Sequence, residues 1–264
     1  MKQRPVVLKF GTGILAREGG CSLDKAQFRR LCSEIASLIA SGIPCVIVSS
    51  GAVAAGVDAL GLPDRPSDLA GKQACAAVGQ PLLMEAYTRQ FQRQGLRTAQ
   101  LLLTHDDIFD EGRRRNASVT LGKLLSSRGI VPVINENDTV AVEELRFGDN
   151  DRLSAEVAQL VSARLLLLLT SADGLLGKVS GPGGKAVRIP VITDVESAFR
   201  HVTAEKGRLS TGGMGAKLQA VRTAVEAGVE TVIAHGRKKG RITGAVAGED
   251  VGTRFPAKRV PKRR

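Results

Sequence analysis

Short apolar segments alternate along this chain with longer segments that have apolar residues on one face only. The apolar segments are expected to be strands, and they span residues 6–10, 45–48, 98–103, 130–134, 165–169 and 230–234. Apolar strands that alternate with helices are typical of a parallel sheet covered on both faces. Neither a linker nor an internal repeat divides the pattern, so the sequence predicts one α/β/α domain built on a parallel sheet.

The predicted helices lie between these strands and show apolar residues at helical spacing. We expect the first helix to begin with Ser22 as its N-cap and to stop at Gly42. The other helices are predicted at 52–60, 82–94, 114–128, 153–161 and 216–227. Pro63 and Pro66 indicate a break before the third helix, and residues 135–150 are expected to form an acidic loop or hairpin.

The composition excludes several classes of protein. Hydrophobic residues make up 43% of the 264 residues, which provides a large core and excludes a disordered chain. Aromatic residues are only 3%, too few for the stacking platforms that bind single-stranded nucleic acid. No run approaches the roughly 18 apolar residues of a membrane span, and the N-terminal apolar stretch is too short for a signal peptide. We therefore predict a cytoplasmic protein without a membrane partner.

Cysteine and histidine are scattered along the sequence. The four cysteines lack the spacing of metal ligands and are expected to be buried thiols in a reducing compartment; they are Cys21, Cys32, Cys45 and Cys75. Each of the three histidines stands alone, and no spacing of a Ser-His-Asp triad is recognisable. We therefore predict neither a protein metal site nor a hydrolytic triad.

Positive charge is concentrated towards the C-terminus. The formal net charge is +12, and residues 237–264 carry ten lysines or arginines against Glu249 and Asp250. The chain ends in AKRVPKRR, which has neither an aromatic residue nor a periodic apolar face. Such an arm can bind phosphate backbones, but a solvated, disordered tail is the preferred interpretation. The charge is therefore weak evidence for nucleic acid, and we predict no nucleic-acid partner.

Polar residues, glycines and two lysines lie at the carboxyl ends of the predicted strands. The segments are KFGTG at 9–13, SSGA at 49–52, NEND at 135–138, GDND at 148–151, TS at 170–171 and, before the last predicted helix, STGGMGAK at 210–217. In open α/β sheets, ligands bind beyond the carboxyl ends of the strands. We expect the functional site to be built from these segments.

Two of these segments are similar to nucleotide-binding motifs but lack a required residue. Gly11, Gly13 and Ala16 have the spacing of the dinucleotide fingerprint, yet the second strand ends in serines, without the acid that would hold a ribose. The segment from Gly207 begins like a P-loop, but Gly213-Met214 stands where that loop requires a lysine followed by serine or threonine. Neither motif is therefore favoured.

Lys9 and Lys217 both lie beside glycine-rich turns. Each lysine alone has an ordinary structural explanation, since Lys9 could extend to the edge of the sheet and Lys217 could face solvent. Positive charge is unfavourable at a helix N-terminus, however, which indicates that an anion belongs beside Lys217. Together, two lysines and the backbone N–H groups of glycine-rich turns predict a phosphoryl-transfer site, since that chemistry needs positioned cations more than acid–base groups.

Five segments together resemble the glutamate 5-kinases of the amino acid kinase family. They are KFGTG, VIVSSGAVAAG, VINENDTVA, FGDNDRLSA and STGGMGAKLQAV, in this order. The resemblance implies a three-layer α/β/α sandwich around a mainly parallel sheet of about eight strands. We therefore expect a kinase domain at 1–253 and a disordered basic tail at 254–264. The C-terminal domain that many members carry, which resembles domains of RNA-modifying enzymes, is not expected in this chain.

The resemblance also implies an activity. Glutamate 5-kinases use ATP and Mg²⁺ to phosphorylate the γ-carboxylate of L-glutamate to L-glutamyl 5-phosphate, the first step of proline biosynthesis. A carboxylate is already ionised at neutral pH and needs no general base, which agrees with the lack of a recognisable histidine dyad. The family further implies a homo-oligomer, a dimer or a tetramer, and proline as a feedback inhibitor.

The matching positions imply a role for each residue of the site. Lys9 and Lys217 would hold the transferring phosphoryl group, and Asp151 would orient both lysines. The residues implied to bind glutamate are Ser50, Asp138 and Asn150, with Asp138 accepting from the ammonium and the other two donating to carboxylates. The residues implied to bind the nucleotide are Lys9, Gly11, Thr170, Ser171, Thr211, Gly212, Gly213, Met214, Gly215, Ala216 and Lys217.

Other interpretations stay open at this point. Taken singly, Asp138, Asn150 and Asp151 are also typical of turn caps. Ser171 and Leu176 stand where the family usually has aspartate and tyrosine, a difference that bears on nucleotide binding. The nearest alternative function is another activity of the family on a small carboxylate or phosphate. A further alternative is a non-catalytic member that binds proline, a nucleotide or RNA.

Overall fold

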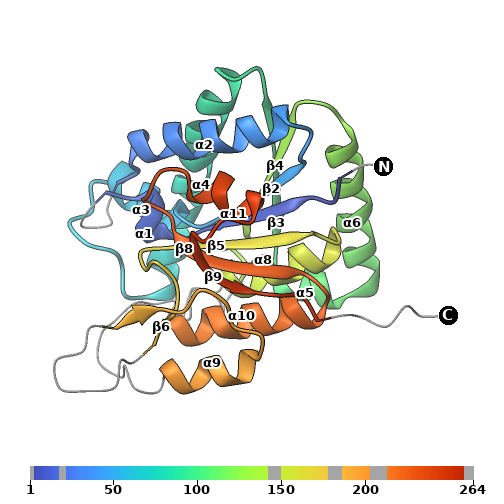
Figure 1. Ribbon diagram of the computed structural model, residues 1–264. Coiled ribbons are helices and arrows are strands. Elements are labelled where there is room, and N and C mark those ends of the chain that lie inside the picture. Colours follow the sequence, from blue (N-terminus) through green and yellow to red (C-terminus); the bar gives the residue numbers. More distant parts are fainter. Residues whose placement is uncertain (1–2, 18–21, 142–149, 178–185, 203–212, 259–264) are drawn as a thin grey trace.

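The computed structural model describes residues 3–17, 22–141, 150–177, 186–202 and 213–258. Its centre is a sheet of seven strands in the order β3-β4-β2-β1-β5-β8-β9 (Figure 1). These strands are β1 (Val6–Phe10), β2 (Cys45–Ser49), β3 (Arg97–Leu103), β4 (Ile130–Glu136), β5 (Leu165–Thr170), β8 (Glu230–His235) and β9 (Gly252–Phe255). Neighbouring strands are parallel except β9, which is antiparallel to β8. A separate short hairpin consists of β6 (Leu176–Gly177) and β7 (Val187–Arg188).

The six strands predicted from the apolar runs are all present, and the mainly parallel sheet is confirmed. Within the described residues the sheet has seven strands rather than about eight. The strand that the apolar pattern did not predict is β9, whose sequence GTRF is short and half polar. It continues two residues past the predicted domain boundary at 253, so Arg254 and Phe255 belong to the sheet rather than to a tail. Residues 259–264 of the predicted tail lie outside the described residues.

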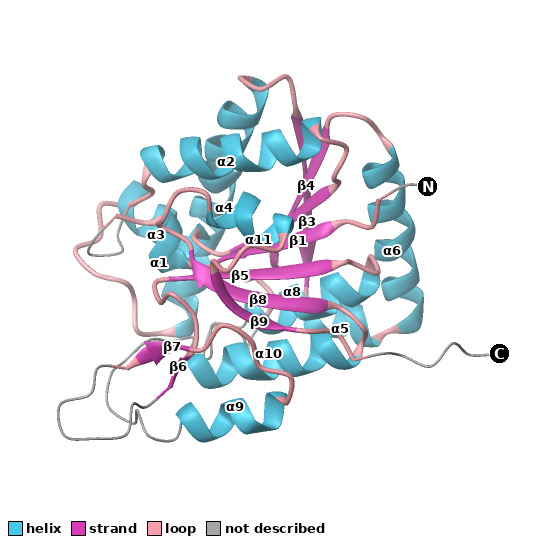
Figure 2. Ribbon diagram, in the orientation of Figure 1, coloured by secondary structure: helices cyan, strands magenta, loops and turns pink. Residues whose placement is uncertain are grey.

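Helices cover both faces of the sheet, which confirms the three-layer arrangement (Figure 2). One face packs against α1 (Thr12–Leu15), α2 (Lys25–Ala40), α3 (Ala52–Ala59), α4 (Leu69–Gln92) and α11 (Arg241–Ala247). The other face packs against α5 (His105–Phe109), α6 (Glu111–Ser126), α8 (Asn150–Leu160), α9 (Val195–Val202) and α10 (Met214–Glu226). Alternate residues of each strand enter opposite cores, as in β1, where Leu8 faces the first group and Val7 the second.

Five of the six predicted helices begin at residues other than those predicted; α6 begins at Glu111 rather than at residue 114, and α10 at Met214 rather than at residue 216. The N-cap of α2 is Asp24 rather than Ser22, because the Asp24 carboxylate accepts hydrogen bonds from two backbone N–H groups of the first turn. Helix α8 begins at Asn150 rather than at residue 153, so its first turn carries both Asn150 and Asp151. A helix rather than a loop therefore positions these two predicted site residues.

Helix α4 differs most from its prediction, because it begins at Leu69 rather than at residue 82 and continues through Pro81. Asp68 caps its start by accepting a hydrogen bond from the backbone N–H of Gly71. A proline inside a helix removes one backbone hydrogen bond and favours a break. The buried residues of α4 lie on both sides of Pro81, so packing against the sheet overrides this local preference.

Two glycines allow α3 and α4 to approach each other closely. A Cβ atom on Gly56 of α3 would lie 1.8 Å from the backbone oxygen of Cys75, and one on Gly79 of α4 would lie 1.8 Å from that of Ala52. No side chain fits at either position without separating the helices. The contact matters for the site because Ala52 begins α3 directly after the Ser50–Gly51 turn.

Two further expectations from the sequence are that the cysteines are buried thiols and that no segment spans a membrane. Cys32, Cys45 and Cys75 are free and buried, as predicted, and burial raises the pKa of the Cys32 and Cys45 thiols. Cys21 lies outside the described residues. Within the described part of the chain, no helix combines the length and the apolar character needed to cross a membrane.

We expect Gly79→Ala to destabilise the protein because its new methyl group would overlap the Ala52 backbone oxygen. Overpacking of this kind costs about 1–3 kcal/mol in the free energy of unfolding. The matched control is Gly122→Ala in α6, where a Cβ meets nothing within 4 Å, and we expect it to be neutral or stabilising. Urea unfolding of both variants measures the difference; equal midpoints would contradict the close contact.

Candidate active site

A carboxylate flanked by two lysines lies at the carboxyl end of the central strand. Lys9 of β1 has the same parity as Val7, so its side chain extends towards α8 and α10. There its Nζ lies 2.6 Å from Oδ1 of Asp151, and Nζ of Lys217 lies 3.1 Å from Oδ2 of the same carboxylate. Three segments far apart in sequence, β1 and the first turns of α8 and α10, thus meet through one carboxylate.

These three side chains are almost completely withdrawn from solvent. Asp151 is 1% exposed, Lys9 5% and Lys217 9%. Burial by itself would raise the pKa of Asp151, but the charges and hydrogen bonds of Lys9 and Lys217 outweigh it and hold that pKa below its ordinary value. Two ammonium groups and one carboxylate give these three side chains together a net charge of +1, a sign that suits an anion.

The backbone beside the lysines carries little side-chain bulk. Gly213 is the N-cap of α10 and, as a glycine, supplies no side-chain cap to the N-terminal N–H groups of this 13-residue helix. A Cβ on Gly11 would lie 3.6 Å from Nζ of Lys9, in contact with the ammonium group. The helix N-terminus adds partial positive charge to that of the two lysines.

The predicted glutamate-binding residues are brought together only in part. Asn150 Nδ2 donates to Oγ of Ser50 at 3.0 Å and to Oδ1 of Asn135 at 3.1 Å, which joins the ends of β2 and β4 to the start of α8. Asp138 lies in the turn that follows β4, three residues after Asn135. Both hydrogens of the Asn150 amide are thus engaged, which differs from the expectation that this amide donates to a substrate carboxylate.

The turn that carries Ser50 is fixed from two sides. Gly51 has φ of 113°, a conformation that residues with a side chain rarely adopt, and it is the N-cap of α3. Ser49 Oγ lies 2.9 Å from the hydroxyl of Tyr87, a fully buried residue of α4. The close packing of α3 and α4 therefore extends to the position of Ser50.

The predicted nucleotide-binding residues lie at two places along the same edge of the sheet. Thr170 ends β5, and the exposed Ser171 follows it. The segment from Gly213 to Lys217 forms the cap and the first turn of α10. Thr211 and Gly212 lie outside the described residues. The sequence therefore placed these residues at the end of a strand and beside the start of a helix, although α10 begins at Met214 rather than at the predicted residue 216. The roles of these residues stay predictions.

His235, which the sequence left as an isolated histidine, lies beside this edge. It ends β8 directly opposite Thr170 of β5, and its Nδ1 accepts a hydrogen bond from the backbone N–H of Arg237. Burial is the main reason that its pKa lies below the ordinary value, so the imidazole is neutral at pH 7. Nearby, Lys238 Nζ lies 2.6 and 2.7 Å from the two carboxylate oxygens of Asp173. The sequence indicated that His235, Lys238 and Asp173 lie near the site only through their position close to the ends of predicted strands.

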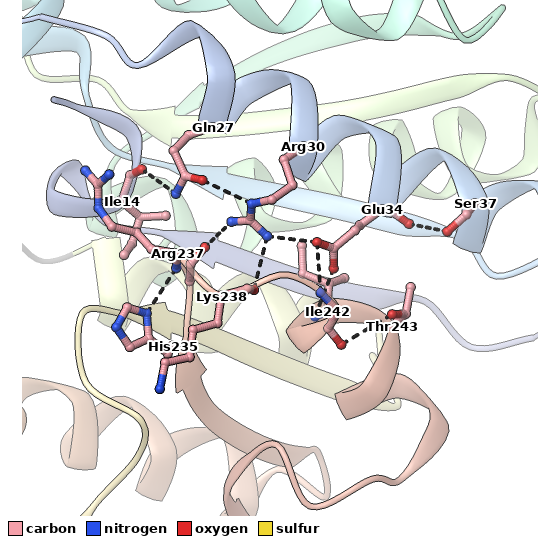
Figure 3. A network of polar contacts seen from close by, with 12 residues as sticks. Ile14, Gln27, Arg30, Glu34, Ser37, His235, Arg237, Lys238, Ile242 and Thr243 are labelled. Atoms are coloured by element: carbon pink, nitrogen blue, oxygen red, sulfur yellow. Dashed lines mark hydrogen bonds and ion pairs between the residues drawn. The ribbon is translucent and has the colours of Figure 1, made fainter.

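A polar network fastens the turn after β8 to α2 (Figure 3). Arg30 donates to the backbone oxygens of Gly236 and Lys238, and it is paired with Glu34 at 2.8 Å. Glu34 in turn accepts hydrogen bonds from backbone N–H groups at the start of α11, including that of Ile242 at 3.3 Å. These contacts hold the turn beside the end of β5 in one position.

Metal-ligating side chains do not gather in the described part of the chain. No group of three or more histidine, cysteine, aspartate or glutamate side chains there could hold an ion. Both oxygens of Asp151 already face ammonium groups.

We expect Asp151→Asn to lower the free energy of unfolding by about 3–5 kcal/mol, because it leaves two buried ammonium groups without their counter-charge. The pKa of Asp151 is lowered on folding, so its contribution is fully present above the unfolded-state pKa of about 3.9 and is lost as the pH falls through the lower folded-state value. The difference between the wild type and the variant should thus stay constant from pH 8 to pH 5.

Urea unfolding at several pH values measures this difference. Asp58→Asn is the matched control, since Asp58 is an exposed carboxylate on α3, and its effect should be within about 0.5 kcal/mol. A difference that already shrinks between pH 7 and pH 5 would mean that the pKa of Asp151 is raised rather than lowered.

Comparison with known proteins gives consistent matches over the chain. A model of the amino acid kinase family matches residues 4–235. A glutamate 5-kinase of Trichlorobacter lovleyi is 47% identical over 253 residues, which cover 96% of this chain and 67% of that protein. A glutamate 5-kinase of Thermus thermophilus is 44% identical over 259 residues, covering 98% and 69%. Among solved structures, a UMP kinase from Bacillus anthracis aligns over 97% of both chains with a TM-score of 0.61 and 17% identity, a likeness of fold alone.

Proposed function

The chain belongs to the amino acid kinase family, among its glutamate 5-kinases, and we propose that Lys9, Lys217 and Asp151 are the groups with which it phosphorylates glutamate. The observation that supports this assignment is the buried pair of lysines held by one carboxylate, at 2.6 and 3.1 Å. The reaction uses ATP and belongs to proline biosynthesis. Another activity of the family is less well supported, because relatives at 41–47% identity are glutamate 5-kinases.

The reaction joins two anions, so its main barrier is electrostatic repulsion. An oxygen of the γ-carboxylate forms a bond to the γ-phosphorus of ATP, the bond from that phosphorus to the bridging oxygen breaks, and ADP leaves; no proton is transferred. Lys9 and Lys217 would bind the oxygens of the transferring phosphoryl group, where negative charge is spread in the transition state. Asp151 fixes both ammonium groups, so they need no reorganisation during the reaction.

Glutamate is proposed to bind at the ends of β2 and β4. The Ser50 hydroxyl accepts a hydrogen bond from Asn150, so its own hydrogen is available for a substrate carboxylate. Asp138 is proposed to bind the substrate ammonium, as an acceptor of opposite charge. These assignments place the amino acid on the β2–β4 side of Lys9, because the sheet order is β4-β2-β1-β5.

The nucleotide is proposed to bind on the other side of β1, along Gly11, Thr170, Ser171 and residues 211–217. Mg²⁺ keeps most of its water and is usually held by one or two carboxylates together with substrate phosphates. The described residues offer no cage of three such side chains, which fits an ion that arrives on the phosphates of ATP. Bound there, Mg²⁺ would neutralise phosphate charge, and Lys9 and Lys217 would complete that neutralisation on the γ-phosphoryl group.

Four further properties are proposed from the family resemblance alone. They are a kinase domain that ends near β9, assembly into a dimer or tetramer, feedback inhibition by proline, and a cytoplasmic location. A proline inhibitor would share an ammonium-type nitrogen and a carboxylate with glutamate, so the Ser50 and Asp138 region is the proposed place for it.

The direct test of the activity is ADP release from ATP with glutamate, aspartate, N-acetylglutamate and UMP as acceptors. We expect glutamate to be the preferred acceptor by a wide margin in kcat/KM. Activity with one of the others but not with glutamate would overturn the specific assignment and leave the fold unaffected. Binding of proline or nucleotide without turnover of any acceptor would instead support a non-catalytic member.

We expect Lys217→Ala to lower kcat by roughly 10²–10³, the effect of removing one preorganised stabilising group. The KM values should change less, because this interaction strengthens in the transition state. Lys217→Arg should also be poor, since a planar guanidinium does not replace a compact ammonium beside Asp151. Lys123→Ala is the control, as Lys123 is exposed on α6. A folded Lys217→Ala protein with normal kcat would remove Lys217 from the mechanism.

A further inference from the structure

Four side-chain amides connect the proposed glutamate site with β3, the outermost strand on one side of the sheet. Asn150 Nδ2 donates to Oδ1 of Asn135 at 3.1 Å, Asn135 Nδ2 donates to Oε1 of Gln80 at 2.9 Å, and Gln80 Nε2 donates to Oε1 of Gln100 at 2.9 Å. We call these four residues the amide relay. Asn150, Asn135 and Gln80 each donate to the next member of the relay. The last hydrogen bond is accepted by Gln100, whose side chain is exposed on the edge strand β3.

The fold places the relay on one face of the sheet. Gln100 pairs with Val133, and Val133 and Asn135 are two residues apart, so all three side chains lie on the face that α4 covers. Gln80 comes directly after Gly79, where α4 touches the backbone of α3. The glycine contact therefore sets the height at which Gln80 lies above Asn135.

The direction of the relay decides what Asn150 offers to a ligand. Its two amide hydrogens are given to Asn135 and Ser50. Its Oδ1 is shielded from solvent, and no hydrogen bond reaches it from the residues that the structure describes. A buried oxygen that accepts no hydrogen bond favours the binding of a ligand with a hydrogen-bond donor at that point. Glutamate has a single strong donor at neutral pH, its ammonium group, because both carboxylates are acceptors only.

Resting on the proposed function, we propose that Gln80 is a positioning residue for glutamate. Its Oε1 holds the Asn135 amide in one direction, and Asn135 in turn holds Asn150 so that Oδ1 is presented to the substrate ammonium. Asn150 and Asp138 then share the recognition of the ammonium, and Ser50 donates to a carboxylate. The relay thus favours substrates that have a free ammonium group. It does so through the direction of uncharged amides and adds no further buried charge.

Two substitutions of Gln80 separate direction from mere packing. Gln80→Met has a similar length but offers Asn135 only a weak thioether acceptor in place of the amide oxygen, so the Asn135 and Asn150 amides are free to turn over. Gln80→Glu still accepts from Asn135 and cannot donate to it, so it permits only the direction found in the structure. The exposed Gln100 can turn its own amide to donate to the new carboxylate.

We expect Gln80→Met to raise the KM for glutamate roughly tenfold, the scale of one hydrogen bond to a charged group. The KM for ATP and the Tm should remain close to those of the wild type. Gln80→Glu should keep the glutamate KM near the wild-type value. Gln92→Met, an exposed glutamine on the same helix, is the matched control and should change nothing. ADP release at varied glutamate and at varied ATP measures all of these constants.

Asn150→Ala tests the proposed glutamate site separately from the amide relay. If it leaves the glutamate KM unchanged, the proposed glutamate site itself is wrong. If it raises that KM while Gln80→Met does not, the site stands and the relay is overturned. Equal impairment by Gln80→Met and Gln80→Glu would also overturn the relay, as would a fall in Tm together with a rise in both KM values, which a merely structural role predicts.

Discussion

The pairing of Asp151 with Lys9 and Lys217 is the interaction on which the rest of the site depends. A single buried lysine would be costly, and two without a counter-charge would repel each other across the end of the sheet. One carboxylate between them fixes both ammonium groups, and the three side chains together carry a net charge of +1, which suits the phosphoryl group that they are proposed to bind. The same contact determines where α8 and α10 begin relative to β1, because each helix contributes a charged residue from its first turn.

The proposed recognition of the amino acid would rest on different forces. Around Ser50 and Asn150 the contacts are hydrogen bonds between uncharged side chains, and their direction carries the information. These side chains are held by the packing of α3 and α4, which the absence of a Cβ at Gly56 and Gly79 permits. In the proposed site, charged side chains bind the phosphoryl group on one side of β1, and oriented amides bind glutamate on the other.

The apolar pattern and the strand ends predicted much of this arrangement. Runs such as 6–10 and 165–169 are apolar at nearly every position and are bounded by turn residues, a pattern that favours a short strand buried on both faces. Parallel strands bring their carboxyl ends to one edge, which is why the order of the residues alone was enough to assign Lys9 and Ser50 to a common site. The start of α4 was predicted wrongly, because Pro81 is a strong local signal and the packing that overrides it is not local.

The sequence by itself therefore determined the layers of the fold, the edge of the sheet that carries the site, and the residue types gathered there. Only the tertiary structure decided which of those residues touch: Asp151 between two lysines that are 208 positions apart in the chain, and Asn150 joined through Asn135 to Gln80. The physical reason is the distance along the chain over which each kind of interaction acts. Periodicity and turn chemistry act over a few residues, whereas an ion pair or the direction of an amide depends on the atoms that folding brings within about 3 Å.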